Sequence, residues 1–243
     1  MLALAREMST IAKVWVCAPD AQQSATGHSL TVRHPLEVHE IAMEGTQKAW
    51  HVNGKPADCV KIAFLTLVQE PIDLVLSGIN EGSNCGTDTL YSATVAGAME
   101  GALNGAPSMA LSLCLFGENK EEIDFGPSAR IARMLVQAWQ AGWLAIPPMA
   151  MLNVNIPDKP DGERKGYKLA RTGVQHYSDV YELVEETEAY RQYHLHGERI
   201  PSEEDDLAID LVAVAEGYVT LTPMTADRTN HTLLREMEKD WRL

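Results

Sequence analysis

Short apolar segments alternate with segments of helical periodicity along the first 157 residues of the chain. The apolar segments, typical of strands buried on both faces of a parallel sheet, lie at 12–18, 73–77, 108–115 and 151–156. Helical periodicity occurs at 1–11, 58–67, 92–104 and 129–139. This alternation predicts an α/β fold, a Rossmann-like three-layer sandwich with helices on both faces of a mostly parallel sheet.

Beyond residue 157 the composition changes. Tyrosines recur among many charged residues in the segment 166–199; they are Tyr167, Tyr177, Tyr181, Tyr190 and Tyr193. We interpret 160–200 as a protruding hairpin arm that serves oligomerisation. A return strand and a tail helix are predicted within 205–243, so the 243 residues form a single domain whose core is 1–157.

Charge and composition exclude several classes of protein. The chain has 34 acidic and 20 basic residues, a net charge of −14, which argues against binding a nucleic acid polymer or an anionic membrane. It contains no uninterrupted apolar run of membrane-spanning length, and its first residues do not resemble a secretory signal. The four cysteines form no CxxC pair, so reduced thiols and a cytoplasmic location are expected.

The segment 78–91 follows the predicted strand at 73–77 and is rich in glycine, asparagine and serine. Open α/β sheets bind ligands at the carboxyl ends of their strands, and long structureless loops in compact domains are usually functional. Asn80 and Asn84 offer carbonyl oxygens, which suit Mg²⁺ or Mn²⁺. The alternative is that these asparagines only stabilise turns.

The helix predicted at 92–104 begins with Ser92, a favourable N-cap residue. Its free amides and positive dipole end would attract a phosphate, with the hydroxyls of Ser92 and Thr94 as additional donors. An ordinary serine cap is the simpler alternative. Gly97, Gly101 and Gly105 recur at four-residue spacing and predict close packing along this helix, since glycine otherwise destabilises it.

Other polar residues carry weaker signals. Ser24 and His28 lie in a loop after the strand at 12–18, where either could face a ligand or solvent. Asp58 is expected to cap a helix rather than to act as a general base. The histidines form no HExxH or comparable ligand cluster. The sequence also contains no GxSxG, P-loop or GxGxxG motif, which disfavours serine hydrolase, Walker NTPase and dinucleotide-binding functions.

Taken in order, several segments resemble the stationary-phase survival protein SurE family. They are APD at 18–20, SATGHSLT at 24–31, GKPADCV at 54–60, DLVLSGINEGSN at 73–84, YSATVAGAMEG at 91–101, LNVNIPD at 152–158 and EGYVTLTP at 216–223. The resemblance implies a nucleotidase that uses a divalent metal, Mg²⁺ or Mn²⁺, to hydrolyse nucleoside 5′-monophosphates, and also 3′-monophosphates and short polyphosphate.

The resemblance also implies roles for individual residues. Ser24 and Asn80 match metal ligands of the family, and Asn84, Ser92 and Thr94 match residues of its phosphate pocket. The tyrosine-rich segment looks like the family's swapped arm, which implies a homodimer or homotetramer.

One departure from the family stands out. The family holds its metal with two further aspartates in an Asn-Asp-Asp-Gly stretch after a first strand, and this chain has no such stretch. The alignment of Ser24 leads us to expect that about fifteen residues, including a central strand, would precede Met1. Substitution by Asp20, Glu81 or Asp88 is not expected, so a non-catalytic family member that binds phosphate or acts as a structural oligomer is the alternative.

Overall fold

The computed structural model describes residues 1–115, 123–239 and 241. Its main sheet has five strands in the order β4-β5-β6-β12-β7. These strands are β4 (Val75–Glu81), β5 (Ser108–Cys114), β6 (Ala150–Pro157), β12 (Val219–Thr225) and β7 (Tyr167–Leu169). Strands β4, β5 and β6 are parallel, whereas β12 runs antiparallel to β6 and parallel to β7.

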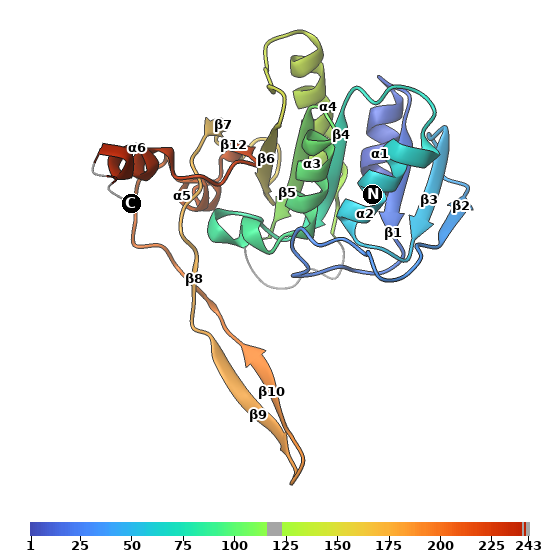
Figure 1. The fold of residues 1–243 in the computed structure, drawn as a ribbon. Helices are drawn as coiled ribbons and strands as arrows, with labels where there is room; N and C mark the ends of the chain where they lie inside the picture. The colour runs from blue at the N-terminus through green and yellow to red at the C-terminus, as the bar shows by residue number, and fades with distance from the viewer. Residues whose placement is uncertain (116–122, 240, 242–243) are drawn as a thin grey trace.

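A second sheet has three strands in the order β1-β3-β2. They are β1 (Trp15–Pro19), β3 (Lys48–Val52) and β2 (Val38–Ile41), with β1 parallel and β2 antiparallel to β3. Among the described residues, β1 and β4 are each the edge of their sheet, so the two sheets do not join through hydrogen bonds. Figure 1 shows β4 and β1 running in the same direction on the two sides of this break.

Helices cover both faces, which confirms the predicted three-layer α/β architecture (Figure 1). Helices α1 (Leu2–Ser9) and α4 (Gly126–Gln140) pack on one face, where their apolar residues meet Leu111 and Val154. Helix α3 (Ala93–Leu103) packs on the opposite face, against Ala110 and Met151. Alternate residues of β5 and β6 therefore contact different layers, as expected for strands buried on both sides.

Several predicted boundaries were wrong in detail. The strand expected at 73–77 begins at Val75 and extends to Glu81, so part of the predicted loop belongs to the sheet. The extended stretch expected at 30–41 forms a strand only in β2, and β3 was not predicted. The sequence of β3, KAWHV, mixes polar, apolar and aromatic residues, because only part of the strand is buried. It therefore lacks the strict alternation by which a strand is predicted.

Asp58 stabilises a helix start, but not as the first capping residue. Helix α2 (Pro56–Ile62) begins two residues earlier and has Lys55 as its N-cap. The Oδ2 atom of Asp58 accepts a hydrogen bond from the Lys55 backbone N–H at 2.9 Å, and its carboxylate also accepts bonds from the backbone N–H and the hydroxyl of Thr31. A short π-helical turn, η1 (Ala63–Leu67), continues α2.

Of the three glycines predicted to pack closely along this helix, Gly97 and Gly101 lie in α3 and are required by close packing. A Cβ atom at Gly97 would lie 2.7 Å from Ser77 Oγ, and one at Gly101 would lie 2.8 Å from Val75 Cβ. The prediction was wrong for Gly105, which has open space around it. Gly105 instead adopts φ +93° after the helix end, and the Ala106 N–H bonds to the Gly101 carbonyl as in a Schellman motif.

Replacing Gly101 by alanine is expected to destabilise the protein by about 1–3 kcal/mol, because the added methyl group overpacks the contact between α3 and Val75. Chemical denaturation of the purified variant measures this difference. Gly162→Ala is the matched control, since a Cβ there meets nothing within 4 Å. Equal stability of the two variants would show that α3 can move away from β4 without a loss of stability.

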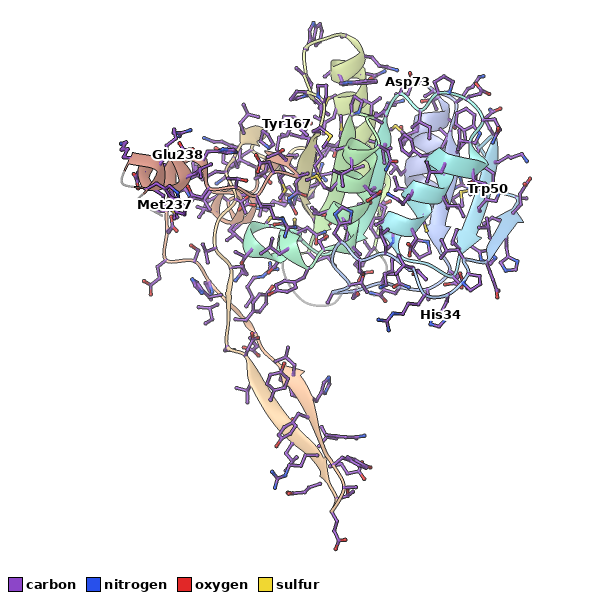
Figure 2. The ribbon with its side chains drawn as sticks, in the orientation of Figure 1. His34, Trp50, Asp73, Tyr167, Met237 and Glu238 are labelled. Atoms are coloured by element: carbon purple, nitrogen blue, oxygen red, sulfur yellow. The ribbon has the colours of Figure 1, made fainter. Side chains whose placement is uncertain are left out.

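The arm extends away from the sheets as a long ribbon (Figure 1). Strands β9 (Val180–Glu186) and β10 (Arg191–His196) pair antiparallel, and β8 (His176–Tyr177) pairs with β11 (Arg199–Ile200) at its base. Its apolar side chains are exposed; they include Val180, Tyr181, Leu183, Val184, Tyr190, Tyr193 and Leu195. Figure 2 shows the side chains of β9 and β10 standing clear of the rest of the molecule.

After the arm, the chain forms helix α5 (Asp210–Ala215), strand β12 and the exposed tail helix α6 (His231–Lys239). All four cysteines are free thiols. None of the helices in the described part of the chain is long and apolar enough to cross a membrane.

Candidate active site

The carboxyl end of β4 carries Asn80, which was predicted to lie in a structureless loop. Its side-chain amide donates hydrogen bonds to the carbonyls of Glu81 (3.1 Å) and Gly82 (2.9 Å). Because both donors of the amide are used, Asn80 Oδ1 is directed away from these carbonyls. It lies 3.4 Å from the Thr94 hydroxyl.

Thr94 is in the first turn of α3. The helix begins where it was predicted to begin, directly after Ser92. Ser92 is the N-cap, and its Oγ accepts a hydrogen bond from the Val95 N–H at 3.1 Å. The Ser92 hydroxyl can still donate its own proton, since an oxygen that accepts one bond remains a donor. The first amides of α3 and the positive end of its dipole thus lie beside Asn80 at the carboxyl edge of the sheet.

Asn84 is buried beneath this edge, and polar side chains bond its side-chain amide and its backbone. Its side-chain amide donates to Ser112 Oγ at 2.7 Å, and its backbone N–H donates to Asn155 Oδ1 at 2.8 Å. Its carbonyl accepts bonds from the side-chain amides of Asn153 and Asn155. In this structure Asn84 holds the segment after β4 onto the sheet, and its role in phosphate binding stays a prediction.

Asn153 and Asn155 were not singled out from the sequence. They alternate with apolar residues in β6, so they lie on one face of the strand, and both are fully buried. Two asparagines separated by one residue in an apolar strand indicate a buried polar contact, because buried amides require hydrogen-bond partners. Here the partner is the backbone of Asn84.

Asp210 is a second residue that sequence reasoning missed. Its fully buried carboxylate accepts hydrogen bonds from the backbone N–H groups of Gly86 (2.8 Å), Gly173 (2.9 Å) and Leu211 (2.8 Å). Gly86 begins η2 (Gly86–Leu90), the 3-10 helix that leads into α3. Asp210 therefore ties the segment before α3 to α5 and to the chain that enters the arm.

Ser24 lies exposed in its loop, where its hydroxyl accepts a hydrogen bond from the Gln22 side chain at 3.1 Å. The Gly27 N–H donates to the Tyr91 carbonyl at 2.9 Å, which holds the loop next to the start of α3. No hydrogen bond joins Ser24 to Asn80 among the described residues. The structure thus brings Asn80 and Thr94 together directly and places Ser24 only in an adjoining loop.

His28, in the same loop, faces a buried carboxylate. Its Nε2 lies 2.8 Å from Glu100 Oε2, and Lys61 Nζ lies 2.6 Å from Glu100 Oε1. Burial raises the pKa of Glu100, but hydrogen bonds from Lys61, His28 and Asn104 outweigh it, so this pKa lies below its ordinary value. Glu100 therefore anchors the loop to α3 as a carboxylate.

We expect Glu100→Gln to lower the free energy of unfolding by about 1–3 kcal/mol at neutral pH, because charge-assisted hydrogen bonds are lost. A carboxyl whose pKa is lowered by folding stabilises the protein above its unfolded pKa of about 4.3 and loses this effect as pH falls through the folded value. The gap between wild type and variant should therefore close below about pH 4.

Denaturation at a series of pH values measures this gap, with the exposed Glu185→Gln as the control. If wild type and Glu100→Gln differ in stability by the same amount at pH 7 and at low pH, Glu100 does not stabilise the fold as a carboxylate.

The donor set does not fit a divalent cation by itself. Ser24 and Asn80 supply neutral oxygens, and the described residues contain no group of three or more His, Cys, Asp or Glu side chains that could hold a metal. Asp88 is engaged elsewhere, since its Oδ2 accepts hydrogen bonds from Tyr177 (2.6 Å) and Arg199 (2.9 Å). Neutral oxygens cannot replace the lost hydration of a dication, so we derive no chemical step through a metal.

The fold defines the chain as an α/β protein. At the carboxyl end of its parallel strand β4, polar side chains lie beside the N-terminus of helix α3, which is the usual ligand-binding position in such sheets. The family model described as Survival protein SurE matches residues 1–179. The chain belongs to the SurE family.

Individual relatives agree with this assignment. The chain is 40% identical over 233 residues to a protein named 5′-nucleotidase SurE from Synechococcus sp. (strain JA-3-3Ab), covering 93% of this chain and 86% of that one. It is 38% identical over 241 residues to the protein of that name from Syntrophomonas wolfei, with coverages of 98% and 88%. The crystal structure of SurE from Aquifex aeolicus matches with a TM-score of 0.79 and 35% identity, covering 98% of this chain and 92% of that one.

Proposed function

We propose that this protein is a phosphomonoesterase that hydrolyses nucleoside 5′-monophosphates to nucleoside and phosphate, and accepts 3′-monophosphates and short polyphosphate. The observation that carries the proposal is the position of Thr94, in the first turn of α3, beside Asn80 at the end of β4. The name 5′-nucleotidase, which relatives 40% and 39% identical to this chain carry, supports the same reaction.

In this proposal the chain binds the phosphoryl group through α3. The first amides of the helix and the hydroxyls of Ser92 and Thr94 donate hydrogen bonds to the phosphate oxygens, where negative charge is concentrated during transfer. Asn84 and its buried partners keep the segment before α3 in place, so the donors are oriented before the substrate binds. No residue of the described chain is assigned as the general base.

Metal dependence is part of the proposal, with Mg²⁺ or Mn²⁺ as the cofactor and Ser24 and Asn80 as its candidate ligands in this chain. Since these two ligands are neutral, bound phosphate would have to supply negative charge. We therefore expect Mn²⁺ alone to give no saturable binding in isothermal titration calorimetry. Tight binding of Mn²⁺ without phosphate would show that carboxylates of this chain form a site that the structure does not reveal.

Thr94→Val is expected to weaken phosphate binding about tenfold, because it removes one donor from an otherwise isosteric side chain. Calorimetric titration with inorganic phosphate or a nucleoside monophosphate measures the change. The control is Thr66→Val, an exposed threonine of η1. If the two variants bind phosphate equally well, α3 is not the phosphate site.

A second function, a non-catalytic protein that binds phosphate or serves as a structural oligomer, is favoured by the neutral donor set around Asn80. Assays of phosphate release with Mg²⁺ or Mn²⁺, with and without chelator, separate the two functions. Phosphate binding without metal-dependent release would favour the second.

We further propose that the protein is a cytoplasmic homodimer or homotetramer assembled through the arm. The exposed apolar side chains of β9 and β10, such as Tyr181 at 68% and Val184 at 63% exposure, support a contact between subunits. Sedimentation analysis of a variant that carries Tyr181→Asp and Val184→Asp tests this, and a monomer is the expected result. Unchanged assembly would place the contact elsewhere.

A further inference from the structure

The base of the arm is hydrogen-bonded directly to the segment that joins β4 to α3. Arg199 of β11 and Tyr177 of β8 lie opposite each other in this base, so their side chains leave the same face of the strand pair. Both contact Asp88, whose Oδ2 accepts hydrogen bonds from the Tyr177 hydroxyl at 2.6 Å and from Arg199 Nη2 at 2.9 Å. Arg199 Nη1 donates to Ser83 Oγ at 2.7 Å. One guanidinium group therefore holds two points of this segment.

The contact between Arg199 and Asp88 is charge-assisted and partly shielded from water. The side chains of Arg199 and Asp88 are 42% and 16% exposed, whereas those of the ion pair between Arg191 and Glu186, farther along the arm, are 61% and 49% exposed. Burial and the bond to Asp88 raise the pKa of Tyr177, so its hydroxyl keeps its proton at neutral pH and donates it. Because water screens shielded charges less, the Arg199 contact is expected to be the stronger of the two ion pairs.

The backbone of Asp88 connects this contact to the candidate active site. Its carbonyl accepts hydrogen bonds from the N–H groups of Tyr91 at 3.0 Å and Ser92 at 3.1 Å, and Ser92 is the N-cap of α3. Thr87, the residue before Asp88, is also bonded to the arm, since its Oγ1 accepts a hydrogen bond from the Gln175 N–H at 3.1 Å. A displacement of Asp88 would therefore shift Ser92 and the first turn of α3.

We propose that Arg199 is a positioning residue of the phosphate site, which holds Asp88, and through Asp88 the start of α3, in the arrangement that binds phosphate. The base of the arm then sets the phosphate affinity of its own chain. This inference rests on the proposed function, because it takes the first turn of α3 as the phosphate site. The alternative is that these bonds only attach the arm to the sheets, and it predicts no change in phosphate affinity when Arg199 is replaced.

Isothermal titration calorimetry of the full chain with inorganic phosphate tests the proposal. Arg199→Gln is expected to weaken phosphate binding about tenfold, because its charge-assisted contact with Asp88 is lost. Arg199→Lys keeps a cation beside Asp88 and should bind phosphate within about threefold of wild type. Arg191→Gln, the matched control, removes an ion pair of 2.6 Å from the arm itself and should leave the affinity unchanged. Wild-type affinity in Arg199→Gln, or a lysine variant as weak as the glutamine variant, would overturn the proposal.

A double variant tests the route through Asp88. Asp88→Asn removes the charge that Arg199 contacts and should also weaken phosphate binding. If Arg199 acts through Asp88, the variant with both Arg199→Gln and Asp88→Asn should bind phosphate no more weakly than Asp88→Asn alone, whereas additive losses would overturn the proposal. Tyr177→Phe removes the other side-chain bond to Asp88 with little change of shape. It should weaken binding about threefold, and if Arg199→Gln fails to fold, unchanged affinity in Tyr177→Phe would overturn the proposal.

Amide hydrogen exchange separates a failure of this inference from a failure of the proposed function. The N–H groups of Tyr91, Ser92 and Val95 are hydrogen-bonded at the start of α3. In Arg199→Gln they should exchange about tenfold faster without any phosphate present, whereas Arg191→Gln should leave their exchange unchanged. If wild type binds no phosphate, the proposed function fails, and this exchange alone decides whether Arg199 positions α3. Unchanged exchange in Arg199→Gln would overturn the inference.

Discussion

Replacing Asp210 by asparagine is expected to lower the free energy of unfolding by about 3 kcal/mol and to weaken phosphate binding. The carboxylate is fully buried and accepts three backbone N–H bonds, among them those of Gly86 and Gly173. An asparagine amide would point its own N–H group at one of these donors. Hydrogen bonds to a charged group contribute about 1.5–3 kcal/mol, and a buried donor left unpaired costs a similar amount.

Denaturant titration measures the stability change, and calorimetry with inorganic phosphate measures the effect on binding. We expect at least about a tenfold loss of affinity, because Gly86 begins the turn that leads to Ser92. Asp205→Asn, in the exposed acidic run before α5, is the matched control. A destabilised Asp210 variant with unchanged phosphate affinity would mean that this anchor supports the fold but not the site.

The layered fold was predictable because its signals are local. The strands at 108–115 and 151–156 are short apolar runs, and α3 has a serine cap and a terminal glycine. The separation of the β1-β3-β2 sheet from the five-stranded sheet was not predicted. Pairing between strands depends on contacts far apart in the sequence, which periodicity does not report.

The candidate site was only partly predictable. Asn80 and Thr94 follow from the position of a polar segment after an apolar strand and before a helix, and the structure places them 3.4 Å apart. Asp210 could not be found in this way, since it lies 124 residues from its partner Gly86 and has no motif around it. Long-range hydrogen bonds from a carboxylate to backbone amides leave no local pattern in a sequence.

The largest effect on activity is expected from Asn80→Ala. This change removes the two bonds that turn the chain after β4 and the oxygen that faces Thr94. Loss of one oriented polar group at a reacting centre typically lowers kcat by about 10²–10³-fold. We expect this loss of kcat for Asn80→Ala whether the Asn80 oxygen contacts a cation or orients the Thr94 hydroxyl.

Phosphate release from a nucleoside monophosphate, with Mn²⁺ present, measures the loss, and calorimetry with phosphate separates binding from turnover. Asn230→Ala is the matched control, since Asn230 also makes a local bond to the backbone, to the Leu233 N–H at 2.9 Å, but lies before α6. If Asn80 oriented only Thr94, the double variant with Thr94→Val should lose no more activity than Asn80→Ala alone, because coupled residues are not additive. Additive losses would instead assign Asn80 a separate contact, and activity equal to that of the Asn230 control would remove Asn80 from the site.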